Sequence, residues 1–210
     1  EDLANITPHT RETIDYWVNA TVPTLDRFAP IGDLSRDSIP NIYDYHRTLI
    51  HNATVLSRGT DQARRGNWWL QNNSLRAGVG SAFNLRSDLM PYYDAPLAPT
   101  NLEYFSSGTG AFFARSSWTS TASWFATIAG QFEQSHAHQD QGSFTFFKGD
   151  WLAVTQNIWS HSGIHDEVSV HNNLRFENSS GSVIGQTRSE SVRSSLSYSN
   201  AGNVLSVHED

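Results

Sequence analysis

The hydrophobic pattern of the chain changes about a third of the way along, and this change constrains the fold most. Up to about residue 75, apolar residues recur at helical spacing. From about Gly110 onward, short β-branched and aromatic runs alternate with turn residues, a pattern typical of strands. Because helices precede strands instead of alternating with them, we expect an α+β protein.

The helical part is expected to contain helices over 10–18 and 39–53, followed by a third that runs to about residue 70. A residue at 37 or 38 would cap the second helix, Gly59 would end it and Thr60 would cap the third. In the β part, Lys148-Gly149-Asp150 predicts a hairpin. The expected strands are Ala111–Ser116, Ser123–Ile128, Ser143–Lys148, Trp151–Gln156, Val168–Phe176, Ser182–Arg188 and Val204–His208.

These patterns predict a helical part over 1–75, an irregular linker over 76–109 and an antiparallel β part, of sandwich or stacked-sheet type, over 110–210. Both ends read as cut, which suggests a processed chain or one piece of a longer protein. At 210 residues with 38% hydrophobic composition, there is enough apolar material for a core. The net charge of −7 and the scattered basic residues argue against nucleic acid as a partner. The chain has no cysteine, and no apolar run approaches the roughly 20 residues of a membrane span.

The segment 135–144 (Ser-His-Ala-His-Gln-Asp-Gln-Gly-Ser-Phe) contains two histidines one residue apart and reads as the entrance to a strand. On a strand, His136 and His138 would project from one face, where two imidazoles can bind a metal or an anion or pass a proton. His171 lies in the expected strand 168–176, which could bring it close to His138. Asp140 and the other nearby carboxylates lack a compelling spacing for zinc.

Arg115 lies in an aromatic strand, where an arginine is either a paired structural cation or a fork that holds a carboxylate or sulfate. Four tryptophans of the β part could stack on sugar rings, although most tryptophans in such a layer belong to the core. We expect one of the four to contact a ligand and name Trp159. The four are Trp118, Trp124, Trp151 and Trp159.

Several runs, taken in order over about residues 25–175, resemble the heparinase II/III-like polysaccharide lyases, which include relatives acting on alginate and other uronate polymers. His-x-His-x-Asp-x-Gly-Ser-Phe, beginning at His136, is the most specific of them. The resemblance implies an (α/α) toroid followed by antiparallel β-sheets, of which this chain would hold the last toroid helices and the first part of the sheets. The other runs are Phe28–Asp33, Phe113–Trp118, Trp151–Val154 and Val170–Asn172.

The resemblance also implies a reaction, the β-elimination of a uronic-acid-containing polysaccharide such as alginate or a glycosaminoglycan. His136 matches the catalytic histidine, while His138 and His171 match ligands of a structural zinc. Thr155 stands where the family commonly has the carboxylate that is the third zinc ligand, and a neutral hydroxyl is a poor ligand. The family's catalytic tyrosine precedes the matched region. We expect a secreted or periplasmic protein whose partners are the anionic polysaccharide and the remainder of the same protein, or a companion chain.

Two other classes of protein fit parts of the sequence. Gly130 followed by His136 and His138 matches the opening of a cupin metal motif, but Gly142 or Ser143 stands where its acidic ligand is expected. A cupin also leaves the helical part unexplained. A non-catalytic sugar-binding β module that keeps the lyase fold is the third possibility, and the loss of the carboxylate at Thr155 favours it.

Overall fold

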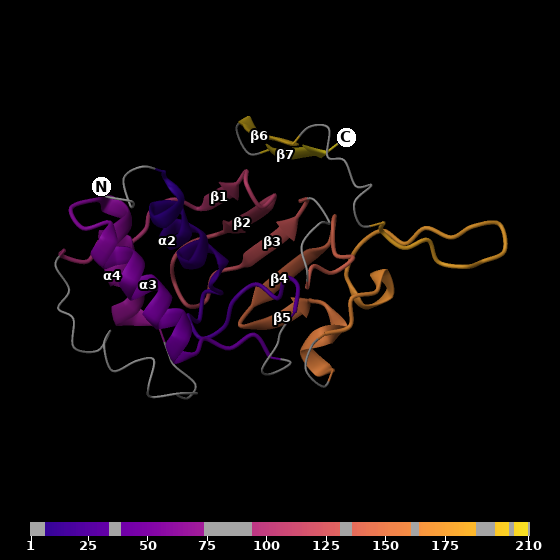
Figure 1. The fold of residues 1–210 in the computed structure, drawn as a ribbon, viewed down its shortest axis with the longest axis horizontal. Coiled ribbons are helices and arrows are strands. Elements are labelled where there is room, and N and C mark those ends of the chain that lie inside the picture. Colours follow the sequence, from indigo (N-terminus) through magenta and orange to yellow (C-terminus); the bar gives the residue numbers. More distant parts are fainter. Residues whose placement is uncertain are drawn as a thin grey trace.

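The computed structural model describes residues 7–33, 39–73, 94–130, 136–160 and 164–187, together with the backbone of 196–201 and 204–209. Helices α2 (His9–Ala20), α3 (Asp44–Leu56) and α4 (Asp61–Asn72) pack against one another at one end of a sheet (Figure 1). The helical part followed by a β part is therefore confirmed. Among the described residues, no helix is long and apolar enough to cross a membrane.

The helices follow from local signals that the sequence already shows. Thr60 caps α4, and its hydroxyl accepts a hydrogen bond from the Ala63 N–H. The second helix begins at Asp44, later than expected, since Tyr43 at its N-cap is still extended. The expected caps at 37 and 38 lie outside the described residues. Gly66 of α4 lies where the three helices meet. A Cβ at this position would lie 2.3 Å from a methyl group of Thr54 in α3 and 3.0 Å from one of Ile14 in α2, so the close packing requires glycine.

Five antiparallel strands form a sheet in the order β1-β2-β3-β4-β5. The expected hairpin at Gly149 is present between β4 and β5, with Lys148 opposite Asp150. A separate pair, β6 (Leu196–Ala201) and β7 (Val204–Glu209), includes the strand expected at 204–208. The strands of the large sheet are β1 (Glu103–Ser106), β2 (Ala111–Arg115), β3 (Trp124–Ile128), β4 (Phe144–Lys148) and β5 (Asp150–Ala153).

Three sequence-based expectations for the β part are wrong. Residues 168–176 contain a short 3₁₀ helix, η2 (Val168–Val170), followed by a loop in place of a strand. The expected strand at 151–156 ends at Ala153, because Thr155 caps a second 3₁₀ helix, η1 (Gln156–Trp159). The expected strand at 182–188 is described up to residue 187. Over these residues it is only an isolated bridge between Glu177 and Val183. Conversely, β1 lies within the range 76–109 expected to be irregular, of which 76–93 is not described.

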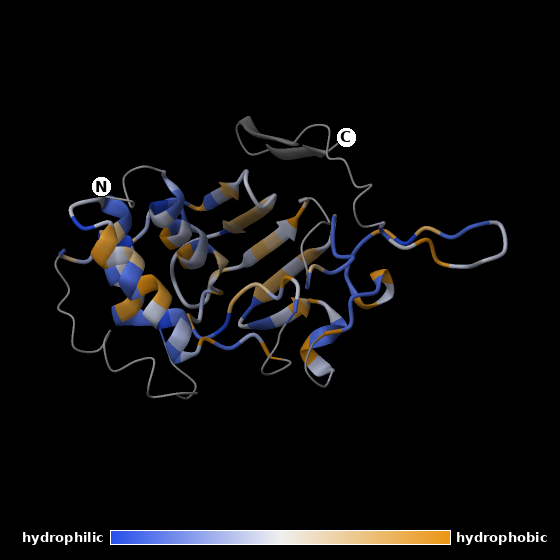
Figure 2. Cartoon of the chain, viewed as in Figure 1, coloured by the Kyte–Doolittle hydropathy of each residue, from blue (hydrophilic) through white to orange (hydrophobic). Residues whose placement is uncertain are grey.

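The sheet and the end of α2 share one core. Phe113, Trp124 and Phe147 from three strands pack with Ala20, the last residue of α2, and with Val22 just beyond it. Apolar residues accordingly concentrate on the central strands (Figure 2). The chain leaves α2 across this core and reaches the loop that ends at Asp33. The core therefore fixes where that loop emerges, beside the segment that carries the two histidines.

Candidate functional site

Asp33 joins the two histidines that stand out in the sequence. Its carboxylate accepts a hydrogen bond from Nδ1 of His136 through Oδ2, and one from Nε2 of His138 through Oδ1 at 2.7 Å. The segment is a loop before β4, so the expected strand geometry is wrong at this point. The two side chains nevertheless converge, because both reach the same carboxylate.

Two turns with left-handed backbone, of which the one at His136 is strained, bring these groups together. His136 has a backbone φ of 68°, in the left-handed region that residues other than glycine seldom adopt. Gly32 precedes Asp33 with a φ of 67°, and its N–H donates to Oδ2 of the buried Asp140 at 3.3 Å. Backbone strain of this kind is concentrated at functional sites. Asp140 therefore anchors the Asp33 loop to the histidine loop.

The hydrogen bonds assign the tautomer of each imidazole. His138 donates from Nε2 to Asp33, so its Nδ1 carries the lone pair and accepts from the Asn157 amide at 3.3 Å. His136 donates from Nδ1, which leaves its Nε2 as the proton-accepting nitrogen. The His136 side chain is 76% exposed and that of His138 only 1%. One imidazole is thus presented to solvent, while the other is a buried link.

The carboxylates on either side of His138 differ in their electrostatics. Burial raises the pKa of Asp33, but hydrogen bonds and Coulombic attraction from His138 and His136 outweigh it, so this pKa lies below its ordinary value. The pKa of Asp140 lies above its ordinary value, because the effect of burial exceeds the lowering by the hydrogen bond from Gly32 and by the charge of His138. Asp33 is therefore the anion that orients the two imidazoles.

His171 lies next to His138, as expected from the sequence, although not on a strand. The two ring centroids are 5.2 Å apart. Burial, followed by the charge of His138, lowers the pKa of His171 to about 4, against the attraction of Asp166. Its Nε2 is buried and has no hydrogen-bond partner among the described residues.

These residues do not complete a zinc site in this arrangement. Both nitrogens of His138 are hydrogen-bonded, to Asp33 and to Asn157. The Thr155 hydroxyl donates to the Val170 carbonyl at 3.0 Å and caps η1. Among the described residues, no three His, Asp or Glu side chains are grouped so that they could hold a metal ion. Zinc stays a prediction, and no step below uses it.

Arg115 lies away from this cluster. It is 6% exposed, and its guanidinium donates to the Asn19 and Thr21 carbonyls at 3.0 and 2.9 Å. The guanidinium also lies over the ring of Trp118, 3.6 Å from the centroid. These contacts favour the structural cation over the anion-binding fork, the two roles that the sequence left open.

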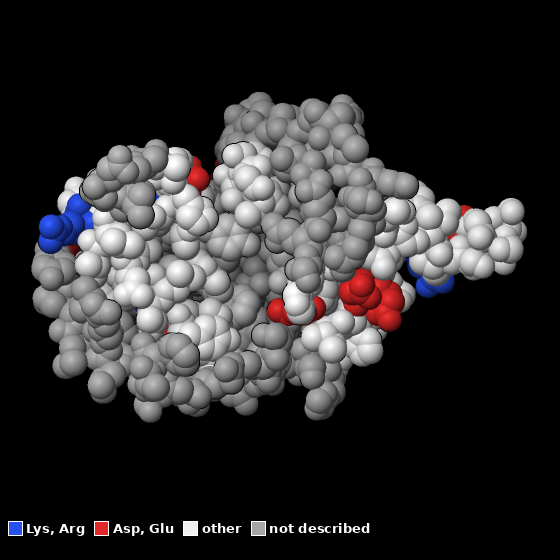
Figure 3. Space-filling model, in the orientation of Figure 1, with Lys and Arg blue, Asp and Glu red and all other residues white. Residues whose placement is uncertain are grey.

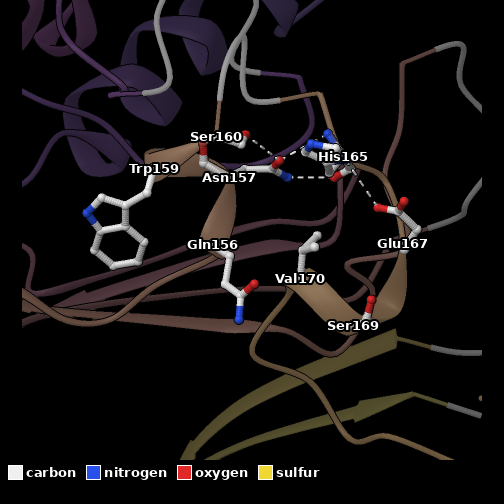
Figure 4. Close-up of a pocket in the computed structure, with 8 residues that line it drawn as sticks. All are labelled: Gln156, Asn157, Trp159, Ser160, His165, Glu167, Ser169 and Val170. Atoms are coloured by element: carbon white, nitrogen blue, oxygen red, sulfur yellow. Dashed lines mark hydrogen bonds and ion pairs between the residues drawn. The ribbon is translucent and has the colours of Figure 1, made fainter.

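Of the four tryptophans, Trp159 is the one that is largely exposed, at 72%, whereas Trp124 is fully buried. Trp159 lines a pocket of about 630 Å³ formed by η1 and the loop around η2 (Figure 4). Sequence reasoning missed Asp33 and Asn157, which hold the cluster together. Asp33 ends the run Phe28–Asp33 that resembles the lyases, and this resemblance was the available signal.

Solved structures of heparinase III are among those similar to this chain. Two structures titled "Heparinase III-BT4657 gene product", one with methylated lysines, match with TM-scores of 0.54 and 0.58 at 15% and 16% identity. The fold of this chain is therefore similar to part of these structures. Each match covers 92% of this chain but only 26% of the heparinase III chain, so the chain spans about a quarter of that protein's length.

A heparan sulfate lyase HepC from Pedobacter heparinus also matches, with a TM-score of 0.44 and 16% identity, over 75% of this chain and 20% of that one. No family model matches the sequence. No curated protein matches it either. The resemblance to heparinase-type lyases is confirmed in the fold by the two heparinase III structures. The described strands form an open sheet with edges at β1 and β5, which differs from a cupin barrel.

Proposed function

We propose that this chain is part of a polysaccharide lyase that cleaves a uronic-acid-containing polysaccharide by β-elimination. The observation that carries the proposal is the exposed imidazole of His136, oriented by Asp33, on a heparinase-type fold. Fold similarity alone is an analogy, since one fold serves many functions. The site adds a positioned base that the proposed reaction requires.

Elimination needs a proton acceptor because the C5 proton of a uronate is weakly acidic. Nε2 of His136 takes this proton, the C5–H electron pair forms the C4–C5 double bond, and the C4–O bond to the leaving sugar breaks. Asp33 stabilises the imidazolium that results, as an adjacent carboxylate does for other catalytic histidines. A second group must protonate the departing oxygen. We assign that role to the tyrosine expected from the resemblance, in the remainder of the protein.

His138 holds this arrangement in place. It is buried and connects Asp33 to Asn157, so it keeps the carboxylate aimed at His136 without itself reaching solvent. We treat Asp33 and His138 as positioning residues. The partners of the uronate carboxylate are also expected from the remainder of the protein. Substrates of this size lie outside the cell, which fits a secreted or periplasmic enzyme.

The test uses the full-length protein that contains these residues, incubated with alginate, unsulfated and sulfated glycosaminoglycans and pectate. Elimination is followed by the ultraviolet absorbance of the new C4–C5 double bond. His136→Ala should lower kcat by about 10²–10⁴-fold, the usual contribution of a general base. His9→Ala, which removes another exposed histidine at the start of α2, is the matched control and should leave the rate unchanged.

Asp33→Asn tests the positioning role. It should lower kcat with little change in KM, and Asp33→Glu should restore part of the loss. If none of these polymers gains absorbance, the lyase proposal is wrong. If sugar binding then persists, the non-catalytic binding module is favoured, a second candidate that the exposed Trp159 beside a pocket already supports.

A further inference from the structure

The pocket beside Trp159 is distinct from the Asp33 cluster and has its own lining. Its volume of about 630 Å³ falls within the range of roughly 300–1,000 Å³ typical of ligand sites. In Figure 4, Trp159 and Gln156 lie on one side of the space, and His165 and Glu167 on the other. The described lining residues are Gln156, Asn157, Trp159, Ser160, His165, Glu167, Ser169 and Val170.

The two walls are fixed to each other by a buried amide. Asn157 is 1% exposed, its Nδ2 donates to the His165 carbonyl at 2.6 Å, and its Oδ1 accepts from the His165 N–H at 3.0 Å. The same Oδ1 also accepts from the Ser160 hydroxyl at 3.2 Å. The pocket is therefore preformed, which lowers the entropic cost of binding. Asn157 also donates to His138, so the pocket and the Asp33 cluster share one support.

Trp159 exposes a large apolar ring at the protein surface, where polar side chains are more common. Thr155 caps η1 and buries Ile158 on the inner side of the turn, which leaves Trp159 72% exposed. Indole rings combine a flat apolar face with a polar edge, a combination suited to amphipathic ligands. A pyranose ring has an apolar C–H face and hydroxyls at its rim. The face can stack on Trp159, while Gln156 and Ser169 offer partners to the hydroxyls.

The charge of the lining restricts which sugar this can be. Glu167 lies in the lining, 3.8 Å from Nδ1 of His165. Between residues 136 and 170 the sequence has one basic residue apart from histidine, Lys148, and it lies on β4, outside the described lining. On the face shown in Figure 3, acidic atoms gather near the junction of the sheet and the arm formed by residues 174–187, whereas basic atoms lie at the helical end and under the arm. Residues 136–170 contain four acidic side chains, Asp140, Asp150, Asp166 and Glu167.

We propose that this pocket is a subsite for an uncharged sugar unit stacked on Trp159, and that Glu167 selects against sulfate at this position. The assignment rests on the proposed lyase function and narrows its substrate class. The preferred polymer is an unsulfated one in which uronate units alternate with neutral sugars. A sulfate group in the subsite would meet Glu167 with no lysine or arginine among the described lining residues, at a cost of about tenfold or more in affinity.

The experiment compares three polymers on the full-length protein. Hyaluronan alternates uronate with an uncharged N-acetylated sugar, alginate carries a charge on every unit, and heparin is polysulfated. The expected order of kcat/KM is hyaluronan, then alginate, then heparin. Binding of a hyaluronan tetrasaccharide is measured separately by calorimetry on the His136→Ala protein, so that occupancy of the subsite is read without turnover.

Variants with matched controls assign the effect to the pocket. Trp159→Ala should raise KM on hyaluronan and weaken tetrasaccharide binding by about tenfold, while Trp159→Phe should restore most of the affinity. Phe176→Ala removes another largely exposed aromatic, on the arm, and should change neither. Glu167→Gln should improve kcat/KM on heparin relative to hyaluronan by several-fold. Glu177→Gln, a half-exposed and ion-paired glutamate of the arm, should not.

The outcomes separate this inference from the lyase proposal. If elimination occurs but heparin is the best substrate, or Trp159→Ala leaves KM and binding unchanged, the subsite assignment is overturned and the lyase proposal stands. If no polymer is cleaved but Trp159→Ala abolishes tetrasaccharide binding, the subsite stands and the lyase proposal fails.

Discussion

Two regions of this protein join chain segments about a hundred residues apart, and they do so with different chemistry. At the junction of α2 and the sheet, Arg115 and Trp124 donate to backbone carbonyls, among them that of Asn19. In the candidate site, Asp33, His138 and Asn157 bond through their side chains, across 105 residues in the first pair. A carbonyl is present whatever residue occupies the position, whereas each side-chain link needs both partners. Substitutions in the junction should therefore change stability alone, and substitutions in the site should also change activity.

The largest effect on the junction should come from Arg115→Met. Burial lowers the pKa of Arg115, and its guanidinium occupies two carbonyls and lies over Trp118. The Thr21 carbonyl would lose the guanidinium, at a cost of about 2–3 kcal/mol in the free energy of unfolding because this bond is to a charged group. Urea denaturation measures the loss. Arg115→Lys should recover only part of it, because an ammonium cannot stack flat on Trp118 as the planar guanidinium does.

The same variant tests whether the two regions are separable. Because no contact links Arg115 to Asp33 in the described structure, the kcat of folded Arg115→Met should match the wild type on a cleavable polymer. A fall in kcat by tenfold at a temperature where the variant is fully folded would contradict the separation. It would instead favour the anion-binding role that the sequence left open for this arginine.

A second effect on stability should come from pH, through the buried His46 of α3. Burial lowers the pKa of His46 to about 4, against the attraction of Asp44. The Tyr43 N–H donates to its Nδ1 at 3.0 Å, so the native state holds the imidazole neutral. The unfolded chain binds this proton near pH 6.5. Stability should therefore fall as the pH drops from about 6.5 to 4, by on the order of 2–3 kcal/mol.

Denaturation curves at several pH values measure how the free energy of unfolding depends on pH. Comparison with His46→Gln gives the part of this dependence that is due to His46. The glutamine amide can still accept a hydrogen bond from the Tyr43 N–H but does not titrate. The loss of stability between about pH 6.5 and 4 should therefore be smaller in this variant by the contribution of His46. An unchanged slope in His46→Gln would show that other groups carry the acid sensitivity.

The junction and the site also differ in how far the sequence predicted them. The helices and most strands of the large sheet follow from periodicity and capping, which are local, as Thr60 and Gly149 show. The loops over 136–143 and 164–176 do not, because their alternating pattern resembles a strand although, in the part of the chain that the structure describes, they form none. Side-chain bonds from Asn157 and Thr155 to loop carbonyls hold them instead. No local pattern reveals such links, and so Asp33 and Asn157 were missed.

In the site, the effect of Asn157→Ala should be seen in both stability and activity. The variant loses the bonds to the His165 backbone and to His138, which should cost about 1–3 kcal/mol. KM should rise more than kcat falls, because the pocket wall loses its support while His136 keeps its bond to Asp33. Asn178→Ala removes a turn-forming asparagine of the exposed arm and should change neither constant. Equal losses in both variants would contradict a specific role for Asn157.

The smallest effect is expected at the cap of α4, the element that the sequence predicted most directly. Thr60→Ala removes the acceptor for the Ala63 N–H, bonded at 3.2 Å, and should cost about 1 kcal/mol, whereas Thr60→Ser should be nearly neutral. The loss stays small because α4 is also held by the Arg65–Asp15 ion pair and by the bond from Trp69 to Thr21. The Tm should fall by a few degrees with no change in KM. A change in KM would mean that the helices transmit strain to the site, and the division between a stability region and an activity region would no longer hold.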